Sequence, residues 1–468
     1  MDVNGKRVLV VGLGKSGAAS ALFLAERGAK VAVSDARSQE QLREEIPLLL
    51  DHGVSVETGQ HGERTFRDQD LIVVSPGVPF DVPQLVHARE RGIPVIGEVE
   101  LAAHFLKGHI VAITGSNGKT TTTTLAGDII SAGGRKALVG GNIGTPAITF
   151  VDRSTDDTWI VLEISSFQLE TIATFHPHVA VVLNVTPDHL DRHYTFENYA
   201  AAKARIFENQ TASDFAVLNA DNQPCVAMAS SAKAQVRWFS RLKEVASGAF
   251  LRGDRIIWRD HEGEREIMPV SEIALKGAHN VENVLAAVCV GMIAGIEPAQ
   301  IRRAVAGFKA VEHRLEYVAT VRGVEYYNDS KATNVDATIK ALESFPGRIH
   351  LILGGKDKGS DYSVLNLLLK DRVKRVYTIG AAAAKIEAQA SGTEIVSAVT
   401  LDAAVRRASE AATPGDIVLL APACASFDQF DSYEHRGRVF KELVRQLAAR
   451  TQERERVGSG VSGGSGAV

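Results

Sequence analysis

The residues with the clearest chemical role follow an apolar run, His109 to Thr114, that predicts a buried strand. Next comes a glycine loop, Gly115-Ser116-Asn117-Gly118-Lys119-Thr120-Thr121, and then a helical pattern. Glycines let backbone N–H groups turn toward phosphate oxygens, a lysine can reach terminal phosphates, and a threonine hydroxyl can ligate Mg²⁺. The segment therefore predicts a site for ATP.

This loop departs from the usual G-x-x-x-x-G-K-[ST] pattern. The position five before Gly118 is Ile113, and the first glycine, Gly115, lies two residues closer. The loop is therefore shorter than usual. An alternative interpretation is a Gly-Lys turn before an ordinary helix, but the strand–loop–helix context favours the phosphate site.

Charged side chains also follow two other apolar runs. Glu163 closes Trp159 to Leu162, where an acid can bind Mg²⁺, although it could instead be a surface carboxylate at a strand end. Val179 to Val185 is followed by Asp188 and His189. A histidine after a strand is most often a loop hydrogen-bond partner, but the company of Glu163 and the phosphate loop favours metal or phosphate chemistry here.

A second glycine pattern, Gly12-Leu13-Gly14-Lys15-Ser16-Gly17, follows the first predicted strand, Arg7 to Val11. Asp35 closes the second strand, about where a ribose-binding acid is expected. Taken alone, this pattern predicts NAD. A dehydrogenase should then continue into a domain with a hydride-transfer site, whereas a phosphate loop follows here. The pattern by itself is weak evidence for which diphosphate is held.

Composition bounds the class of protein. The chain has 468 residues, which suggests three domains at about 150 residues each. Its net charge of -4 and pI near 6.4 provide no basic footprint for nucleic acid. Cys225, Cys289 and Cys424 are far apart and indicate neither disulfides nor a zinc site. Without a secretory segment or a membrane-length apolar run, we expect a cytoplasmic protein that is not inserted in a membrane.

Apolar runs alternate with helical patterns along most of the chain, which is typical of parallel sheets in α/β proteins. Further strands are predicted at Lys30 to Ser34, Leu71 to Ser75, Pro94 to Ile96, Ile349 to Gly354, Arg375 to Ile379 and Asp416 to Leu420. We expect a Rossmann-like domain over 1–97, a central P-loop-type domain over 98–310, a Rossmann-like C-terminal domain over 311–450, and a disordered tail over 451–468.

Several motifs occur in a characteristic order. They are Thr114 to Thr120, Leu162 to Leu169, Asn184 to Arg192, Gly277 to Asn283, His313 to Glu316 and Asn328 to Asn334. Together they resemble the Mur ligases over nearly the whole chain. Most are shared with the related folylpolyglutamate synthases, so they indicate the reaction class better than the substrate. Gly141 to Gly144, and Ala421 to Phe430 with Tyr433 and Arg436-Gly437, resemble the branch that adds D-glutamate.

The resemblance implies a ligase that uses ATP to activate the carboxylate of UDP-N-acetylmuramoyl-L-alanine as an acyl phosphate, which D-glutamate then displaces. This reaction belongs to peptidoglycan precursor synthesis. The N-terminal domain would then hold UDP rather than NAD, and a monomer is expected. The alternatives are a sister amino-acid ligase, an NAD-binding Rossmann protein, and a nucleotide switch without ligation.

The resemblance also implies site residues. Those for catalysis are Lys119, Glu163, His189 and Lys203. Those for ATP are Gly115, Ser116, Asn117, Gly118, Lys119, Thr120, Thr121, Asn280, Asn283, Arg314, Asp329 and Lys331. Those for the UDP-sugar are Lys15, Ser16, Asp35, Arg37, Ser75, Gly77, Asn142, Ser165 and His189. Those for D-glutamate are Thr333, Lys358, Ser426 and Tyr433, with Lys356 as the alternative to Lys358.

Two Mg²⁺ ions are implied, with Thr120, Glu163, His189 and Lys203 as ligands. Lys203, in the predicted helix Phe196 to Ile206, matches a lysine that the family carbamylates, that is, N6-carboxylates. Carbamylation converts an ammonium into an anion able to bind metal. The alternative interpretation of Lys203 is a solvated helix lysine.

Overall fold

The fold of the chain comes from a computed structural model that describes residues 1–142, 144–275, 277–308 and 312–460, with side chains up to Thr451. Two compact units are present. The first consists of Met1–Pro187, Arg192–Ile273 and Val281–Phe308, and the second of Asp188–Asp191, Ala274–Asn280 and the chain from 309 onward. Within the described ranges, no helix is long and apolar enough to cross a membrane.

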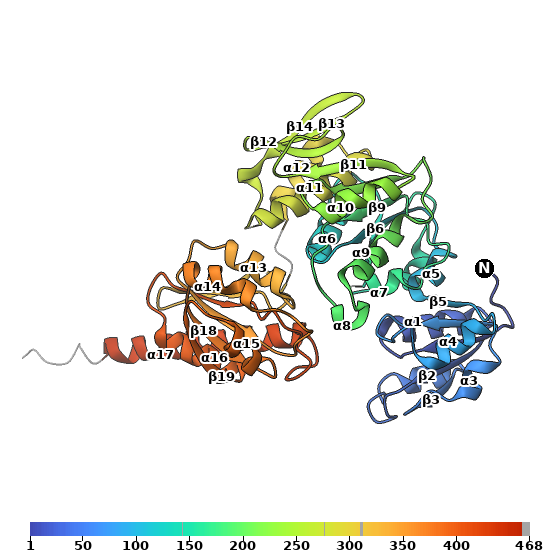
Figure 1. Ribbon diagram of the computed structural model, residues 1–468, viewed down its shortest axis with the longest axis horizontal. Coiled ribbons are helices and arrows are strands. Elements are labelled where there is room, and N and C mark those ends of the chain that lie inside the picture. The colour runs from blue at the N-terminus through green and yellow to red at the C-terminus, as the bar shows by residue number, and fades with distance from the viewer. Residues whose placement is uncertain (143, 276, 309–311, 461–468) are drawn as a thin grey trace, which may run out of the picture. The chain divides into compact units, whose positions relative to one another are not determined.

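The N-terminal domain is built on a parallel sheet of five strands, drawn in blue in Figure 1. In spatial order these are β3 (Ser55–Thr58), β2 (Lys30–Asp35), β1 (Arg7–Val11), β4 (Leu71–Val74) and β5 (Val95–Gly97). The helices are α1 (Lys15–Glu26), α2 (Ile46–Asp51), α3 (Glu63–Arg67) and α4 (Pro83–Glu90). Alternate residues of β1 enter two different core clusters, so both faces of the sheet are buried. The predicted strands of this domain are confirmed.

A short helix, α5 (Glu98–Ala103), joins this domain to the next. Glu100 is buried there, and its carboxylate accepts hydrogen bonds from the backbone N–H groups of Ala173, Thr174 and Phe175 at 2.8–2.9 Å. Glu98 is also buried and accepts a hydrogen bond from Ile148 N at 2.7 Å. Through these hydrogen bonds, the two carboxylates hold the connecting helix α5 against segments of the central domain.

The central domain contains a nine-stranded sheet. In spatial order its strands are β14 (Gly263–Pro269), β13 (Arg255–Asp260), β12 (Gly248–Arg252), β11 (Gln235–Ser240), β10 (Phe215–Asn219), β9 (Val179–Val182), β6 (His109–Thr114), β8 (Trp159–Glu163) and β7 (Ala137–Gly141). The segment from β7 to β12 is parallel. Because parallel strands share a carboxyl edge, the residues that follow β6, β8 and β9 meet there.

Helices of the central domain are α6 (Lys119–Ala132), α7 (Ser166–Leu169), α8 (Leu190–His193), α9 (Phe196–Ala204), α10 (Gln223–Met228), α11 (Ala278–Ile293) and α12 (Pro298–Gly307). Single 3₁₀ turns or short 3₁₀ runs occur at Ala147–Arg153, Arg205–Phe207, Ala229–Ser231 and Val270–Glu272. The predicted strands over β6, β8 and β9 and the helix at α9 are confirmed.

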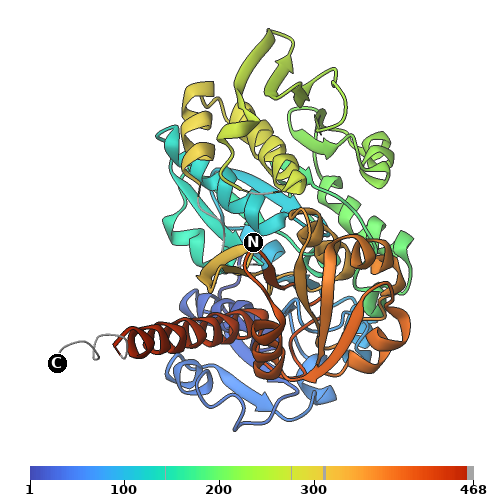
Figure 2. The same ribbon diagram turned by 90° about the vertical axis from the view of Figure 1, so that its left-hand side faces the viewer.

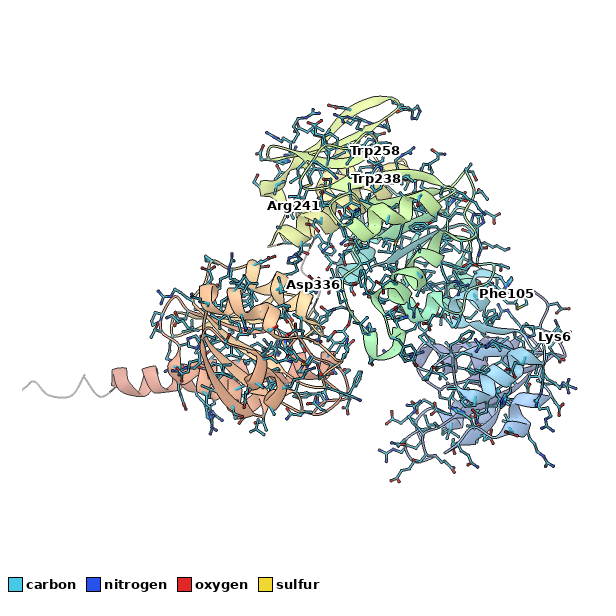
Figure 3. All side chains as sticks on the ribbon, in the orientation of Figure 1. Lys6, Phe105, Trp238, Arg241, Trp258 and Asp336 are labelled. Atoms are coloured by element: carbon cyan, nitrogen blue, oxygen red, sulfur yellow. The ribbon has the colours of Figure 1, made fainter. Side chains whose placement is uncertain are left out.

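The sequence analysis predicted none of the strands from β10 to β14. Strands β12, β13 and β14 form an antiparallel extension, marked in Figure 3 by Trp258 on β13 and Trp238 on the neighbouring β11. Arg252 and Arg259 both pair with Glu264 across these strands. The alternation of apolar and polar residues that marks a strand is absent from β13, in which Ile256 to Trp258 are three consecutive buried residues between charged ones.

The C-terminal domain has a six-stranded sheet. In spatial order its strands are β15 (Glu316–Val321), β16 (Val324–Asn328), β20 (Ile417–Leu420), β17 (Ile349–Gly354), β18 (Val373–Ile379) and β19 (Glu394–Val399). Its helices are α13 (Val335–Glu343), α14 (Asn366–Arg372), α15 (Ala383–Gln389), α16 (Leu401–Ala411) and α17 (Tyr433–Gly460), with a 3₁₀ turn at Ser363–Leu365. Helices α13 and α14 cover one face of the sheet and α16 covers the other (Figure 1). A separate apolar cluster lies on each face.

Helix α17 continues well past the sheet against which it packs (Figure 2). The sequence predicted a disordered tail from residue 451, whereas the backbone of 451–460 is helical and 461–468 lies outside the described residues. The segment Thr451 to Arg456 is composed mainly of good helix formers, which allows the helix to continue without an apolar face.

The three-domain α/β architecture is confirmed.

The connection between the first two domains predicts a pH-dependent stability. Burial raises the pKa of Glu98 to about 7, although hydrogen bonds from Ile148 and Ala147 lower it. Its Oε2 has no hydrogen-bond partner among the described residues. The neutral carboxyl therefore stabilises the fold fully below the ordinary value of 4.5, and this stabilisation is lost as the pH rises through 7.

Glutamine stays neutral at every pH, so the variant Glu98→Gln does not lose stability as wild type does. We therefore expect the free energy of unfolding of Glu98→Gln, minus that of wild type, to increase as the pH rises. The gain between about pH 5 and pH 8 should be on the order of 2 kcal/mol, measured by urea unfolding. Glu90→Gln, at an exposed position of α4, is the control and should show no such trend. A pH-independent difference for Glu98→Gln would contradict the prediction.

Candidate active site

The phosphate-binding loop joins the end of β6 to the start of α6. Gly118, at the N-cap of α6, has a φ of +86°, a left-handed conformation that favours glycine. A Cβ added there would lie 2.2 Å from Asn283 Oδ1 of α11, so only glycine fits. The loop thus presents the N-terminus of a 14-residue helix, where backbone N–H groups and the helix dipole attract anions.

Lys119 is the first residue of α6, and its side chain folds back over the loop. Its Nζ donates hydrogen bonds to Gly115 O at 2.8 Å and to Ser116 O at 2.9 Å. The ammonium group therefore lies next to the phosphate-binding loop. Thr121 is buried, and its Oγ1 has no hydrogen-bond partner among the described residues.

The predicted metal-binding acid, Glu163, is buried at the end of β8 with 2% of its surface exposed. Its Oε2 accepts a hydrogen bond from Thr120 Oγ1 at 2.7 Å, and its Oε1 accepts one from Asn142 Nδ2 at 3.0 Å. The register that sets Gly141 of β7 opposite Glu163 brings Asn142 into reach. A carboxylate and a hydroxyl supply the oxygen ligands that Mg²⁺ prefers, so these residues fit the ion.

Lys203 of α9 is a second buried polar group beside this loop, with 1% of its surface exposed. Its Nζ donates to Gly115 O at 3.0 Å and lies 3.4 Å from Thr114 Oγ1. The amine also lies 4.5 Å from the ring centroid of Tyr199. The alternative interpretation of Lys203 as a solvated helix lysine is therefore wrong.

Sequence reasoning missed a packed group around α8. The Phe167 ring stacks on His193 at 5.3 Å, and the His193 Nε2 is 2.9 Å from Ser166 Oγ. The Arg192 guanidinium carbon lies 4.3 Å from the centroid of the same Phe167 ring. The guanidinium group also donates a hydrogen bond to Val78 O of the N-terminal domain at 2.9 Å. These contacts join the loop after β8, which includes Ser165, to the loop after β4. The sequence holds no local signal for them, because the partners are far apart along the chain.

In the N-terminal domain, Asp35 holds the glycine loop instead of facing outward. Its Oδ2 accepts a hydrogen bond from Leu13 N at 2.6 Å, and both its oxygens accept from the Arg37 side chain, at 2.9 and 3.1 Å. Burial alone would raise the pKa of Asp35, but the hydrogen bonds from Arg37 and Leu13 hold it below its usual value. Both carboxylate oxygens therefore have partners within the loop, which leaves them poorly placed to bind a ribose diol as NAD proteins do.

The glycine loop itself is closely packed. Ser75 Oγ donates to Gly12 O at 2.7 Å, and a Cβ at Gly17 would lie 1.8 Å from that carbonyl oxygen. The loop opens onto the first turn of α1. The predicted UDP-sugar residues at this end of the sheet are Lys15 and Ser16 in that turn, Asp35 at the end of β2, Arg37 just after it, and Ser75 and Gly77 after β4.

In the C-terminal domain, predicted residues lie on the loops after β16, β17 and β20 and at the start of α17. Lys331 Nζ donates to Tyr433 OH at 3.1 Å, and Thr333 follows in the same loop, after β16. Ser426 is buried on the loop after β20. Lys358, on the loop after β17, is half-buried, whereas Lys356 is exposed.

Two charged groups are buried beside these loops. Asp329 is fully enclosed, and burial raises its pKa to about 6, although the Arg314 charge and the Leu315 N–H lower it. The Arg436 guanidinium is completely buried and donates to Ser330 Oγ and O and to the carbonyls of Cys424 and Ala425 at 2.8–3.3 Å. Burial lowers the pKa of Arg436 to about 10. Arg436 thus joins the loop of Thr333 to the loop of Ser426.

The remaining predicted residues lie on α11 and on the loop before α8. Asn280 and Asn283 are both buried, one turn apart on α11. His189 has a φ of +54°, and its Nε2 is 3.6 Å from Asp188 Oδ2. The structure thus brings together Lys119, Thr120, Asn142, Glu163 and Lys203 in the first unit. In the second it brings together Lys331 and Tyr433, with Arg314 near Asp329.

A further cluster of possible metal ligands, Glu312, His313 and Glu316, lies in the C-terminal domain. Lys441 Nζ is 2.5 Å from Glu312 Oε1 and 2.9 Å from Glu316 Oε1. Because the Lys441 ammonium group already pairs with both carboxylates, we assign no metal to this cluster.

Family models match all three domains. Residues 6–97 match the Mur ligase MurD-like N-terminal domain, residues 113–291 the Mur ligase middle domain, and residues 313–424 the Mur ligase glutamate ligase domain. These ranges follow the N-terminal, central and C-terminal sheets.

Close relatives match almost the full length. The chain is 72% identical over 448 residues to the UDP-N-acetylmuramoylalanine–D-glutamate ligase of Koribacter versatilis, covering 96% of this chain and 99% of that protein. It is 60% identical over 447 residues to the protein of the same name from Acidobacterium capsulatum, covering 95% and 97%.

Solved structures agree in fold. A pseudomurein peptide ligase type C from Methanothermus fervidus matches with a TM-score of 0.61 at 19% identity, covering 95% of this chain and all of that one. The UDP-N-acetylmuramate-alanine ligase MurC from Thermotoga maritima matches with a TM-score of 0.58 at 19% identity, covering 94% and 99%. With three matching domain models and full-length relatives of high identity, the chain belongs to the Mur ligase family, in the branch of the UDP-N-acetylmuramoylalanine–D-glutamate ligases.

Proposed function

We propose that this chain uses ATP to join D-glutamate to UDP-N-acetylmuramoyl-L-alanine in peptidoglycan precursor synthesis. Its curated relatives are named for this reaction, and the family is ATP-dependent. One structural observation carries the proposal. The buried Glu163 carboxylate accepts the Thr120 hydroxyl at the N-terminus of α6, beside the amines of Lys119 and Lys203. This is the chemistry that phosphoryl transfer from ATP to a carboxylate requires.

The reaction has two steps. A carboxylate is a poor electrophile, so an oxygen of the L-alanyl carboxylate first attacks the γ-phosphorus of ATP, the bond to the β-γ bridging oxygen breaks, and ADP leaves. The D-glutamate amine then attacks the carbonyl carbon of the acyl phosphate, inorganic phosphate leaves, and the nitrogen loses a proton to give the amide. Lys119 and the α6 N-terminus offset the charge on the phosphates.

Thr120 and Glu163, together with His189 and Lys203, are proposed as the ligands of two Mg²⁺ ions. The hydroxyl and carboxylate oxygens of the first pair suit a hard cation. When bound, Mg²⁺ would neutralise charge on the phosphates. Asn142 orients the Glu163 carboxylate through its hydrogen bond to Oε1.

Lys203 is proposed to be N6-carboxylated. Its amine is buried and lies at the carboxyl edge of the sheet, beside Thr114 and Gly115, and N6-carboxylation would add CO₂ to the neutral form of this amine. The product is an anion on a side chain that lies beside Gly115 of the phosphate loop. That position supports a role as a metal ligand.

The N-terminal domain is proposed to bind the UDP-sugar through Lys15, Ser16, Asp35, Arg37, Ser75 and Gly77, with Asn142, Ser165 and His189 contributing from elsewhere. The engagement of both Asp35 oxygens by Leu13 and Arg37 argues against the NAD alternative. In the C-terminal domain, Thr333, Lys358, Ser426 and Tyr433 are proposed to bind D-glutamate. A cation and hydroxyl groups are the partners that its carboxylates need.

A cytoplasmic monomer is proposed as the working form. All three cysteines are buried and unpaired, which is usual in a reducing compartment.

The first test measures phosphate release from ATP and Mg²⁺ with UDP-N-acetylmuramoyl-L-alanine. We expect stoichiometric ADP and amide only with D-glutamate, and none with L-glutamate, L-alanine, meso-diaminopimelate or no amino acid. Activity with another amino acid would favour a sister ligase. Slow hydrolysis without either co-substrate would favour a nucleotide switch.

The second test concerns Lys203. Native mass spectrometry should find the active protein heavier by one CO₂, and removal of CO₂ should lower its activity. Lys203→Ala should lose most activity, on the order of a hundredfold or more, while Lys233→Ala, at an exposed position, should not. An unmodified mass without CO₂ dependence, together with full activity of Lys203→Ala, would reject the modification.

The third test separates the two lysines after β17. Lys358→Glu should raise the KM for D-glutamate at least about tenfold, because a carboxylate there would repel the substrate, and should change the KM for ATP far less. Lys356→Glu is the matched control because it makes the same charge change two residues away, at an exposed position. Equal effects on both substrates, or a larger effect at Lys356, would reject the assignment of Lys358.

A further inference from the structure

The phosphate-binding loop is braced by the segment that follows β9. Beyond the ends of the two strands, Ser116 N donates to Asn184 O at 2.9 Å. Ser116 Oγ then accepts from Thr186 N at 2.9 Å and donates to Thr186 O at 2.9 Å. The side-chain hydroxyl of Ser116 thus extends the pairing of β6 and β9 past the edge of the sheet.

Asn184 completes this brace with its side chain. Its Oδ1 accepts from Asn117 N at 2.9 Å, and its Nδ2 donates to Asn117 O at 3.1 Å. The carboxamide therefore acts as a substitute peptide group, with one acceptor and one donor matched to both backbone groups of a single loop residue. Asn184 is only half-buried, so filling the core does not explain the presence of this side chain.

The loop needs such an external support. It is shorter than the usual phosphate loop, and Gly115 and Gly118, with φ of +155° and +86°, give the backbone little conformational preference of its own. The N–H groups of Ser116 and Asn117 point to Asn184, so they are not the donors that face a phosphate. The N-terminus of α6, which begins directly after Gly118, is the anion-attracting feature that this loop presents.

We infer that Asn184 is a positioning residue for ATP, which sets the loop so that the α6 N-terminus and Lys119 face the triphosphate. This inference rests on the proposed function. Asn184 and Thr186, which hold the loop, are followed along the chain by Asp188 and the predicted site residue His189.

The test uses two variants of the full-length protein. Asn184→Asp keeps the size of the side chain and an acceptor for Asn117 N, but replaces the donor to Asn117 O with a negatively charged oxygen. Asn184→Ala removes both hydrogen bonds without adding charge. Calorimetry with ADP and Mg²⁺ should give a Kd raised on the order of tenfold or more in both, and a KM for ATP raised in parallel. The KM for the UDP-sugar and for D-glutamate should change much less.

Asn209→Asp is the matched control. Asn209 is half-buried in the same domain, and its Nδ2 donates to Ala173 O at 3.0 Å and Phe175 O at 3.1 Å, before β9 instead of after it. Its variant should lower the Tm as the Asn184 variants do and leave the Kd for ADP unchanged. Comparable ADP affinity in wild type and both Asn184 variants would overturn the inference and leave the proposed function standing. Failure of wild type to bind ADP would overturn both.

Discussion

The hydrogen bonds that hold the buried Glu163 carboxylate are the constraint on which the proposed active site, at the carboxyl edge of the central sheet, depends. A carboxylate with 2% exposure must have its oxygens satisfied inside the protein. Thr120 from α6 and Asn142 from the end of β7 supply the donors. A helix and two strands are thereby held at fixed positions around one charge. The same oxygens are the ones that a divalent cation would use, so the structural requirement and the chemical one coincide.

The N-terminal domain uses a related arrangement for a different purpose. Asp35, at the end of β2, also lies next to a glycine loop, but it accepts the Leu13 N–H of that loop and pairs with Arg37. Its carboxylate stabilises the loop and orients a guanidinium group. In both domains an acid at the carboxyl end of a parallel strand accepts hydrogen bonds beside a glycine loop. Asp35 accepts from the loop itself, whereas Glu163 accepts from the first turn of the helix that follows the loop.

The C-terminal domain also buries a positive charge, beside the loops that carry its predicted site residues. The buried Arg436 guanidinium donates to loop carbonyls and to Ser330, and no carboxylate accepts from it in the hydrogen bonds described above. A buried positive group beside Thr333 and Ser426 suits a pocket for a dicarboxylate, because it raises the local potential without occupying the surface.

The sequence by itself determined the three α/β domains, most of the parallel strands and the phosphate loop, because apolar runs and glycine positions directly record backbone burial and conformation. Motif order also indicated the family, since catalytic residues occupy local segments. Only the tertiary structure decided which side chains meet. Asn184 bonds to Asn117, Arg192 to Val78 and Asp35 to Leu13 through strand register and domain packing, and no local pattern encodes these. The β12–β14 extension was missed because β13 lacks the alternation of apolar and polar residues, and its pairing with β12 and β14 is decided by the tertiary structure.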